Sequence, residues 1–421
     1  MRASDEAVRV DDDASEDGAA RVVDAAVVIF VPGPEVWRRV GTPGGLSLLE
    51  RLLKQLRTLD VGAAVLLVPH GHPLPEVDLG GHATPEVLRV PTEAVDLATA
   101  LAATAHRLPR ASLAVSADRL VDRRVLRTLV GRATTTFASV DGRGVEPVGW
   151  VFAEDVRRWG AAVGAHAERL PLASLDPYSA ELRGVVAPYV IRAGAPDERR
   201  HAWRVLLDHV QKQALDLPGQ YFDTPFENFL VRRLAPTTVT PNQITLLTLI
   251  VAGVVAALFA YGWLRIGVMI ALVVGVLDGV DGKLARLKLA TSKLGELEHI
   301  GDFFYENAWY LSLAAHFHGA TAEPRYWLAG CVLVACDVAD SLLYLVVQRR
   351  TGRMLDELSA FDRRFRAIAG RRNVYVVIFV VGFFSGHASG AFLTAVAWAV
   401  VTVAVHASRA LAVVTAARST S

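Results

Sequence analysis

Residues 276–306, VLDGVDGKLARLKLATSKLGELEHIGDFFYE, decide the architecture because they place acidic side chains within an otherwise apolar region. Asp278 and Asp281 are three residues apart and therefore project from one face of a helix. Three further acids are spaced by four and share a face of the next helix: Glu298, Asp302 and Glu306. A single such acid is most simply a helix-end charge facing water. Five acids on two faces instead predict a site for divalent cations, since Mg²⁺ and Mn²⁺ prefer carboxylate oxygens.

Apolar segments around this stretch predict a membrane domain at residues 241–417. Hydrophobic residues make up 52% of the chain and charged residues 21%, which excludes a disordered chain and disfavours a purely soluble one. Most of the segments approach the roughly 20 residues that cross a bilayer as a helix. Six spans are expected, at about 243–264, 266–288, 299–317, 325–347, 373–386 and 390–415.

The distribution of basic residues predicts the orientation of these spans. The second-to-third and fourth-to-fifth connections are rich in basic residues: Lys283, Arg286, Lys288 and Lys293, then Arg349, Arg350, Arg353, Arg363, Arg364, Arg366, Arg371 and Arg372. The opposite connections hold only Arg265 and Arg325. By the positive-inside rule we expect an integral, multi-pass cell-membrane protein with both termini in the cytoplasm.

The chain before Pro241 has the pattern of a soluble domain. Residues 1–20 are small and acidic, which predicts a disordered tail. Within 21–200, short β-branched runs such as AAVVIFV (25–31) alternate with amphipathic stretches such as SLLERLLKQLRTL (47–59), so we expect an α/β fold with a parallel sheet.

Residues 201–240 are more polar and are expected to form a linker. Within them, PFENFLVRRLA (225–235) sets Arg232 and Arg233 beside apolar side chains. This pattern predicts a juxtamembrane amphipathic helix at the membrane surface.

The spacing Asp278-x2-Asp281-Gly282-x2-Ala285-Arg286-x8-Gly295 resembles the opening of the CDP-alcohol phosphotransferase signature, D-x2-D-G-x2-A-R-x8-G-x3-D-x3-D. The resemblance covers about residues 220–415. It implies six membrane helices and a transferase that moves a phosphoalcohol from a CDP-alcohol donor to a hydroxyl of a lipid or polyol-phosphate acceptor. CMP would leave, with two divalent ions, Mg²⁺ or Mn²⁺, at the site. Relatives in this family form homodimers.

The resemblance also assigns roles to individual residues. Asp278 and Asp281 would bind metal and the donor pyrophosphate. The substrate would be framed by the remaining signature positions and by a residue of the TPNQIT segment (240–245) before the first span: Gly282, Ala285, Arg286, Gly295 and Asn242.

The match departs from the signature after Gly295, where the two expected Asp positions hold His299 and Phe303. A shift by one residue preserves the spacing of four. Glu298 then becomes the third metal-ligand position, and Asp302 becomes both a ligand and the base that deprotonates the acceptor. In the alternative register, Asp302 is the ligand and Glu306 the base.

Other polar residues in the spans are weaker candidates. Asp337 and Asp340 share a face of the fourth span and fit either a polar pocket or hydrogen bonds between helices. Arg371, Arg372 and Arg409 could hold an acceptor phosphate. For the first two, the positive-inside rule is the simpler explanation.

The N-terminal domain resembles a sugar nucleotidyltransferase, as in the bifunctional inositol-phosphate cytidylyltransferase/di-myo-inositol-phosphate-phosphate synthases. Two segments carry this resemblance, TPGGLSLLERLLKQL (42–56) and LAVSADRLVDRRVLRTLV (113–130), the second with Asp118 as the metal-binding residue of that family. Pro32 and Pro34 stand where a glycine-rich loop would cradle phosphates. We therefore expect a degenerate domain.

Three alternative functions are a protein that binds nucleic acid, a transporter, and a catalytically altered relative of the family. A formal net charge of +1, from 44 basic and 43 acidic residues, argues against nucleic acid as a partner. A solute or metal transporter would also use intramembrane acids, but it predicts inverted repeats and leaves Gly282, Ala285 and Arg286 unexplained. A catalytically altered relative with a binding or scaffold role remains the third hypothesis, because of the departure after Gly295.

Overall fold

The computed structural model describes residues 25–37, 45–57, 59, 64–73, 86–290 and 294–419, except the side chains of residues 25, 294–300, 414 and 416–419. The predicted tail at 1–20 lies outside these residues. The chain divides into two compact units, one of Met1–Val36 with Leu52–Leu175 and one of Trp37–Arg51 with Asp176–Ser421.

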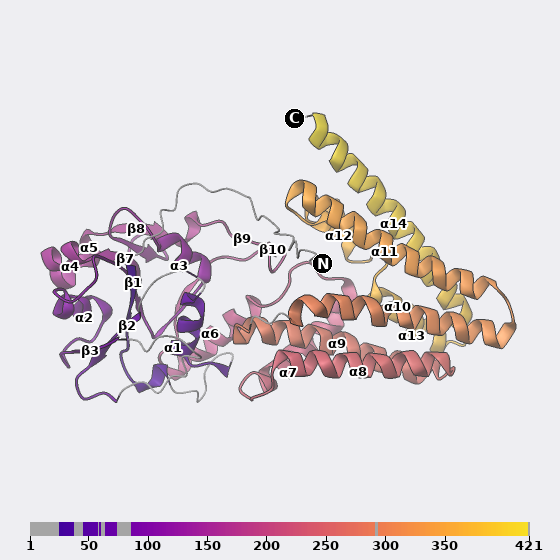
Figure 1. Ribbon diagram of the computed structural model, residues 1–421, viewed down its shortest axis with the longest axis horizontal. Helices are drawn as coiled ribbons and strands as arrows, with labels where there is room; N and C mark the ends of the chain where they lie inside the picture. The colour runs from indigo at the N-terminus through magenta and orange to yellow at the C-terminus, as the bar shows by residue number, and fades with distance from the viewer. Residues whose placement is uncertain are drawn as a thin grey trace, which may run out of the picture. The chain divides into compact units, whose positions relative to one another are not determined.

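A seven-stranded sheet forms the centre of the first unit (Figure 1). Its strands, in spatial order, are β3 (Glu86–Val90), β2 (Ala64–Pro69), β1 (Ala25–Phe30), β4 (Ala111–Ser116), β7 (Val148–Phe152), β6 (Thr136–Ser139) and β8 (Glu168–Pro171). Strands β1 to β4 pair in parallel, and so do β6 and β8. Strand β7 runs antiparallel to both neighbours. The predicted α/β fold is confirmed, and the wholly parallel sheet is corrected at β7.

The core of this unit explains why its strands read as continuous apolar runs. Val28, Phe30, Leu67 and Ala114 are buried at the sheet, because helices cover a largely parallel sheet on its faces. The helices of this part of the chain are α1 (Leu48–Leu56), α2 (Leu97–Thr104), α3 (Arg123–Leu129), α4 (Ala153–Trp159) and α5 (Val163–His166).

Helices follow Pro241 at all six predicted span positions. They are α8 (Pro241–Ala260), α9 (Leu264–Lys288), α10 (Leu294–Thr321), α11 (Arg325–Thr351), α13 (Arg372–Phe384) and α14 (Ala388–Ser419), with the short α12 (Ala360–Arg366) before α13. Three of them are long and apolar enough to cross a membrane: α8, α11 and the Ala388–Val413 part of α14. For α9 and α10, which carry the acids, and for the short α13, a membrane span stays a prediction.

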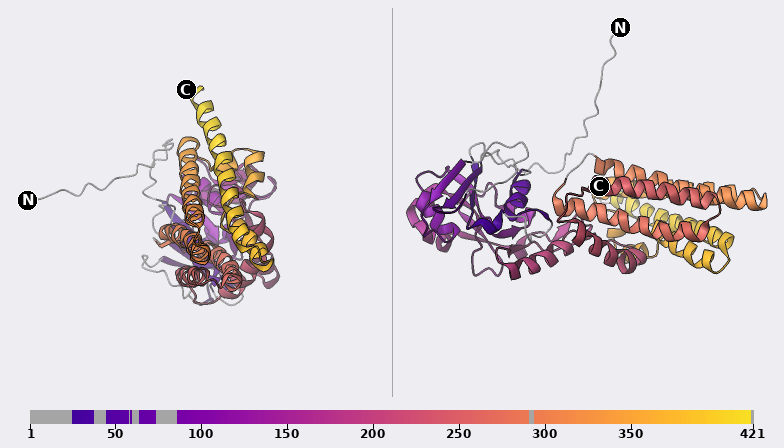
Figure 2. Two further views of the ribbon diagram at one scale, coloured as in Figure 1. Left: turned by 90° about the vertical axis from the view of Figure 1, so that its right-hand side faces the viewer. Right: turned by 90° about the horizontal axis from the view of Figure 1, so that it is seen from below.

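The long helices pack as a bundle (Figures 1 and 2). Its core contains many aromatic side chains. Helix α8 lies along α9 and α10, α11 lies along α10 and α14, and α13 contacts α9 and α14. Trp309 is buried at the centre and donates its indole N–H to the Ala252 carbonyl at 2.8 Å. A side chain of α10 thus anchors the backbone of α8.

Two helices, α6 (Pro196–Asp208) and α7 (Thr224–Leu234), precede the bundle within the second unit. Glu227 and Val231 on α7 are buried, and the helix packs against α9. Phe226 and Phe229 are exposed, and the Arg233 guanidinium lies 5.2 Å from the Phe229 ring. The amphipathic character of α7 agrees with the sequence, and its contact with a membrane surface stays a prediction.

Candidate functional site

Asp281 on α9 is held by a residue of α8. Its side chain is 2% exposed, and its Oδ2 accepts a hydrogen bond from the Thr245 hydroxyl at 2.8 Å. Thr245 belongs to the TPNQIT segment, whose Thr240 and Gln243 form the capping box that starts α8. The start of α8 therefore sets the position of a signature acid on α9.

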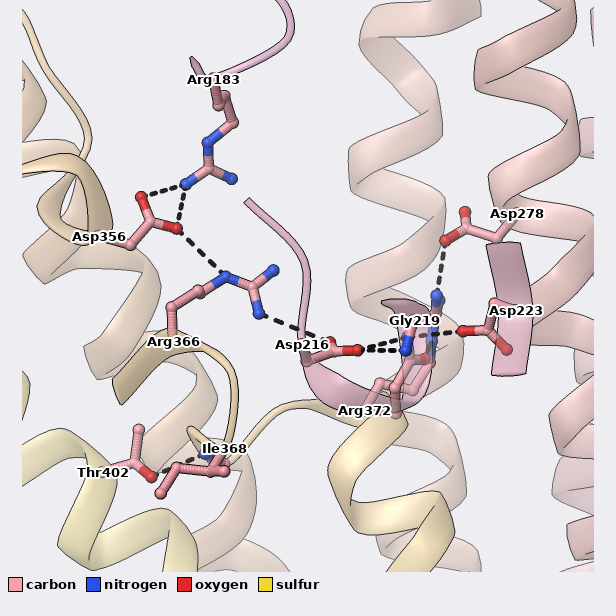
Figure 3. A network of polar contacts seen from close by, with 12 residues as sticks. Arg183, Asp216, Gly219, Asp223, Asp278, Asp356, Arg366, Ile368, Arg372 and Thr402 are labelled. Carbon is pink, nitrogen blue, oxygen red and sulfur yellow. Dashed lines mark hydrogen bonds and ion pairs between the residues drawn. The ribbon is translucent and has the colours of Figure 1, made fainter. Parts of the chain in front are cut away.

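The two predicted acidic faces meet at Arg372, the first residue of α13. Arg372 Nη2 lies 2.6 Å from Asp278 Oδ2 on α9 (Figure 3). Its Nη1 lies 3.2 Å from Glu306 Oε1 on α10 and also contacts the Tyr305 hydroxyl. Asp302 lies close enough to Glu306 and Arg372 to interact electrostatically with both side chains. One guanidinium thus joins acids from two helices.

The donor chemistry of this site fits a hard divalent cation, because all its candidate ligands are carboxylates. Among the residues whose side chains are described, however, no three His, Cys, Asp or Glu residues form a group that could hold a metal ion. Asp278 and Glu306 are turned towards Arg372 instead. The side chain of Glu298, the expected third ligand, lies outside the described residues.

The other signature residues lie on α9, except Gly295, which lies in α10. Arg286 Nε donates to the Val210 carbonyl at 2.8 Å, so this guanidinium holds the backbone of the segment before α7. A methyl group at Gly282 would lie 3.4 Å from Arg286 Nη1, which leaves little room for a larger side chain. Ala285 is half-buried, and Asn242 is exposed at the start of α8.

Lys283 was assigned by charge counting to a cytoplasmic connection, and the structure corrects this. It lies within α9, is 1% exposed, and its Nζ lies 2.8 Å from Glu227 Oε2 on α7. The Asn228 side-chain oxygen accepts a second hydrogen bond from Lys283 at 2.7 Å. A buried ammonium needs such partners. Val280 and Leu287, three residues before and four after Lys283, are apolar and share its face of the helix, which is a sequence signal that Lys283 faces inward.

Two further acids beside α7, Asp216 and Asp223, were not found from the sequence. Both are buried, and the Asn373 side-chain amide donates to Asp216 Oδ1 at 3.3 Å and to Asp223 Oδ2 at 3.1 Å. Burial raises the pKa of the Asp223 carboxyl to about 7, and the nearby charges of Glu227 and Asp216 act in the same direction. Burial also raises the pKa of Glu227, against the opposing effect of Lys283.

The weaker candidates Asp337 and Asp340 lie on α11, and Arg371 immediately precedes α13. Asp337 Oδ2 accepts from the Asn307 amide on α10 at 2.9 Å, and Asp340 Oδ1 lies 2.5 Å from His406 Nδ1 on α14. Both acids therefore make the hydrogen bonds between helices that were one of the two alternatives. Arg371 lies over the ring of Tyr344 with 5.5 Å between guanidinium carbon and ring centre.

Arg409 is bound to an acid of α12. Its Nε lies 2.7 Å and its Nη2 3.0 Å from the two carboxylate oxygens of Asp362. A bidentate pair of this kind occupies the donors that would otherwise meet a phosphate.

In the first unit, Asp118 follows β4 and has protein partners. Its carboxylate accepts from the Ser116 hydroxyl and from Arg119 Nη1, each at 2.6 Å. Arg119 Nε lies 3.5 Å from Glu146. A metal ion at Asp118 would compete with this guanidinium, and the degenerate character of the domain stays a prediction.

Comparison with known proteins gives one family for the helical region. Residues 238–406 match the family described as CDP-alcohol phosphatidyltransferase. The chain is 28% identical over 153 residues to a bifunctional IPC transferase and DIPP synthase of Aquifex aeolicus, a match covering 35% of this chain and 34% of that protein. It is 27% identical over 165 residues to the protein of the same description from Rubrobacter xylanophilus, covering 38% and 34%. The matches thus span about a third of these curated relatives.

One solved structure is also similar. It is a Mycobacterium tuberculosis phosphatidylinositol phosphate synthase with CDP-DAG bound, with a TM-score of 0.34 and 17% identity. The match covers 45% of this chain and 93% of that one.

Proposed function

Residues 238–406 are a CDP-alcohol phosphatidyltransferase domain, and on that premise we propose that the chain transfers a phosphoalcohol group from a CDP-alcohol to a hydroxyl acceptor and releases CMP. The observation that carries this proposal is the convergence of Asp278 on α9 and Glu306 on α10 at Arg372. Acids from two helices that meet beside a cation supply the charged surroundings that phosphoryl transfer needs.

A divalent ion, Mg²⁺ or Mn²⁺, would be held by Asp278, Asp281, Glu298 and Asp302. Such ions neutralise the charge of a pyrophosphate and of its leaving group when they are bound. Thr245 keeps Asp281 in one orientation through its hydroxyl, and Arg372 does the same for Asp278.

The base that takes the proton of the acceptor hydroxyl would be Asp302, with Glu306 as the alternative. A general base must come within hydrogen-bond reach of the hydroxyl. Glu306 contacts Arg372, so its carboxylate would have to leave this guanidinium to reach the acceptor hydroxyl. The register with Asp302 as the base is the one proposed, and the Glu306 variant below tests the alternative.

The acceptor is a lipid or a polyol phosphate. Arg371 and Arg372 lie at the start of α13, and planar guanidinium groups suit phosphate oxygens. The curated relatives are described as bifunctional IPC transferase and DIPP synthase, and the family description names phosphatidyl transfer, so donors of both classes are to be tested. We further propose a homodimer in the cell membrane with both termini in the cytoplasm.

The test measures CMP release from membranes that contain the full chain, given labelled CDP-inositol or CDP-diacylglycerol with Mg²⁺ and an inositol-phosphate or lipid acceptor. Asp281→Asn and Asp302→Asn should lower turnover at least about 100-fold. Glu306→Gln should lower it less if Asp302 is the base, and more if the alternative register holds. Gly253→Ala on α8, where a methyl group meets no atom within 4 Å, is the matched control. Equal turnover in wild type and both Asp variants would overturn the proposal.

A further inference from the structure

The segment before α7 lies outside the residues that match the family, yet it is built into the second unit. The Leu217 amide donates to the Ala367 carbonyl at 2.8 Å, beside the end of α12. A π-helical turn, Gly219–Asp223, follows and leads into α7. Asp216 Oδ1 accepts from the Gly219 amide at 2.8 Å and thereby fixes the start of this turn. Turns of this type often occur at functional sites.

Two buried carboxylates in this segment converge on one amide. Asp216 is 6% and Asp223 4% exposed, and both accept from Asn373 Nδ2. An amide group has its donors on one side and its acceptor on the other. Since two carboxylates demand the donor side, the Asn373 oxygen must point away from them. It accepts from Arg372 Nε at 3.3 Å.

These contacts form a chain that ends at the candidate site, and Figure 3 shows Asp216, Asp223, Arg372 and Asp278 of it. Asp216 and Asp223 orient Asn373, Asn373 contacts Arg372, and Arg372 contacts Asp278 and Glu306. We propose that Asp216 and Asp223 are positioning residues for the transfer reaction, which hold Arg372 against Asp278 and Glu306 through the amide of Asn373. This inference rests on the proposed function, and it adds residues that the family match does not contain.

The charges of the surroundings favour this arrangement. Asp216 also lies 3.5 Å from Arg366 Nη1, and Arg366 Nε lies 3.2 Å from Asp356, which in turn pairs with Arg183. The segment is therefore held from a second side by an ion-pair network. A carboxylate pair that is fixed on both sides can transmit a defined position to Asn373, whereas a solvated pair would reorient freely.

Two variants of Asn373 test the relay. Asn373→Ala removes the amide, and Asn373→Asp places a third carboxylate oxygen against Asp216 and Asp223. Each should lower kcat about 10- to 100-fold with a smaller change in the KM for the CDP-alcohol, as expected when a residue acts through a group of the site. The double variant Asp223→Asn, Asn373→Asp exchanges the amide and the carboxylate, so that an amide at position 223 can donate to a carboxylate at position 373. It should recover most of the kcat lost in Asn373→Asp. Unchanged kcat in Asn373→Ala, or no recovery in the double variant, would overturn the inference.

Leu333→Ala controls for a general loss of packing, because Leu333 is 1% exposed in the bundle core and lies outside the network. It should lower the unfolding temperature and leave kcat of the folded protein within about threefold of wild type, since it removes no contact to the site.

A readout that needs no activity separates this inference from the proposed function. The side chain of Arg372 is 11% exposed, so phenylglyoxal should modify it slowly in the wild-type chain, as followed by mass spectrometry of its peptide. The rate should rise severalfold in Asn373→Ala and stay unchanged in Leu333→Ala, with Arg409, 33% exposed, as the internal reference. If no CMP forms but this protection is lost as expected, the proposed function fails and the positioning stands. If CMP forms and Arg372 stays protected in Asn373→Ala, the positioning fails.

Discussion

Gly279 on α9 allows α7 to approach, and replacing it with alanine tests how firmly the two helices are joined. A methyl group built at Gly279 would overlap the carboxylate of Glu227. That carboxylate is buried and bound to Lys283, so it has little freedom to move aside. The added methyl group must therefore displace Glu227 from the ion pair or push α7 away from α9.

The size of the effect follows from two opposing terms. Breaking a buried ion pair on one side costs about 3–5 kcal/mol, because Lys283 would keep a charge without its partner. Replacing glycine by alanine within a helix contributes up to about 1 kcal/mol in the opposite direction. The net expectation is a loss of about 2–4 kcal/mol in the free energy of unfolding, or roughly 4–8 °C in the unfolding temperature of a unit of this size.

The assay is thermal unfolding of the purified full chain in detergent. Gly253→Ala on α8 is the control, because its methyl group meets no atom within 4 Å and should leave stability unchanged or slightly raised. In a Glu227→Ala, Lys283→Met background the Gly279→Ala change should cost nothing, since the ion pair is already gone. A stable Gly279→Ala protein, or an equal loss in that background, would refute the reasoning.

Two further predictions concern buried polar groups. The folded-state pKa of Asp223 is raised to about 7, so its contribution to stability is complete below about pH 4 and is lost as the pH rises through about 7. This loss of stability is at most about 4 kcal/mol before solvent screening. The unfolding temperature of the wild type should therefore fall between pH 5 and 8, and that of Asp223→Asn should change less over the same range. Parallel pH profiles for the two proteins would contradict this. His406→Ala should cost about 2–4 kcal/mol, because His406 is 4% exposed and its ring contacts Tyr344 and Phe365. In the His406→Ala variant, the further change Asp340→Ala should lower the free energy of unfolding by about 1–3 kcal/mol less than the same change does in the wild type. Strictly additive losses would show that His406 and Asp340 do not interact.

The helix periodicity predicted that acids on two neighbouring helices would face one another. Residues three or four apart share a helix face, and this was enough to bring Asp278 and Glu306 towards one place from two helices. It could not find Arg372 as their common partner. A cation before an apolar segment satisfies the positive-inside rule equally well when it faces water, and only the packing of α13 against α9 decides between the two positions.

The charged residues that the sequence analysis misplaced or missed have a common physical explanation. Lys283, Asp216 and Asp223 are charged, and charged residues are rarely buried unless they are paired. Pairing depends on partners that are distant in sequence, such as Glu227 for Lys283 and Asn373 for the two acids. In the first unit, the antiparallel direction of β7 escaped prediction for a similar reason, since a buried apolar run is the same for either strand direction.

The contacts of α7 also bear on where the transferase domain begins. The family match starts at residue 238, but Lys283 within the signature has its carboxylate partner at Glu227, and Asn373 has its partners at Asp216 and Asp223. A domain cut at residue 238 would remove α7, and with it both side chains that Lys283 contacts, Glu227 and Asn228. It would also release the amide that contacts Arg372. The physical domain must therefore include the segment from Asp216, and the residues that surround the acids of α9 belong in part to a stretch that the signature does not describe.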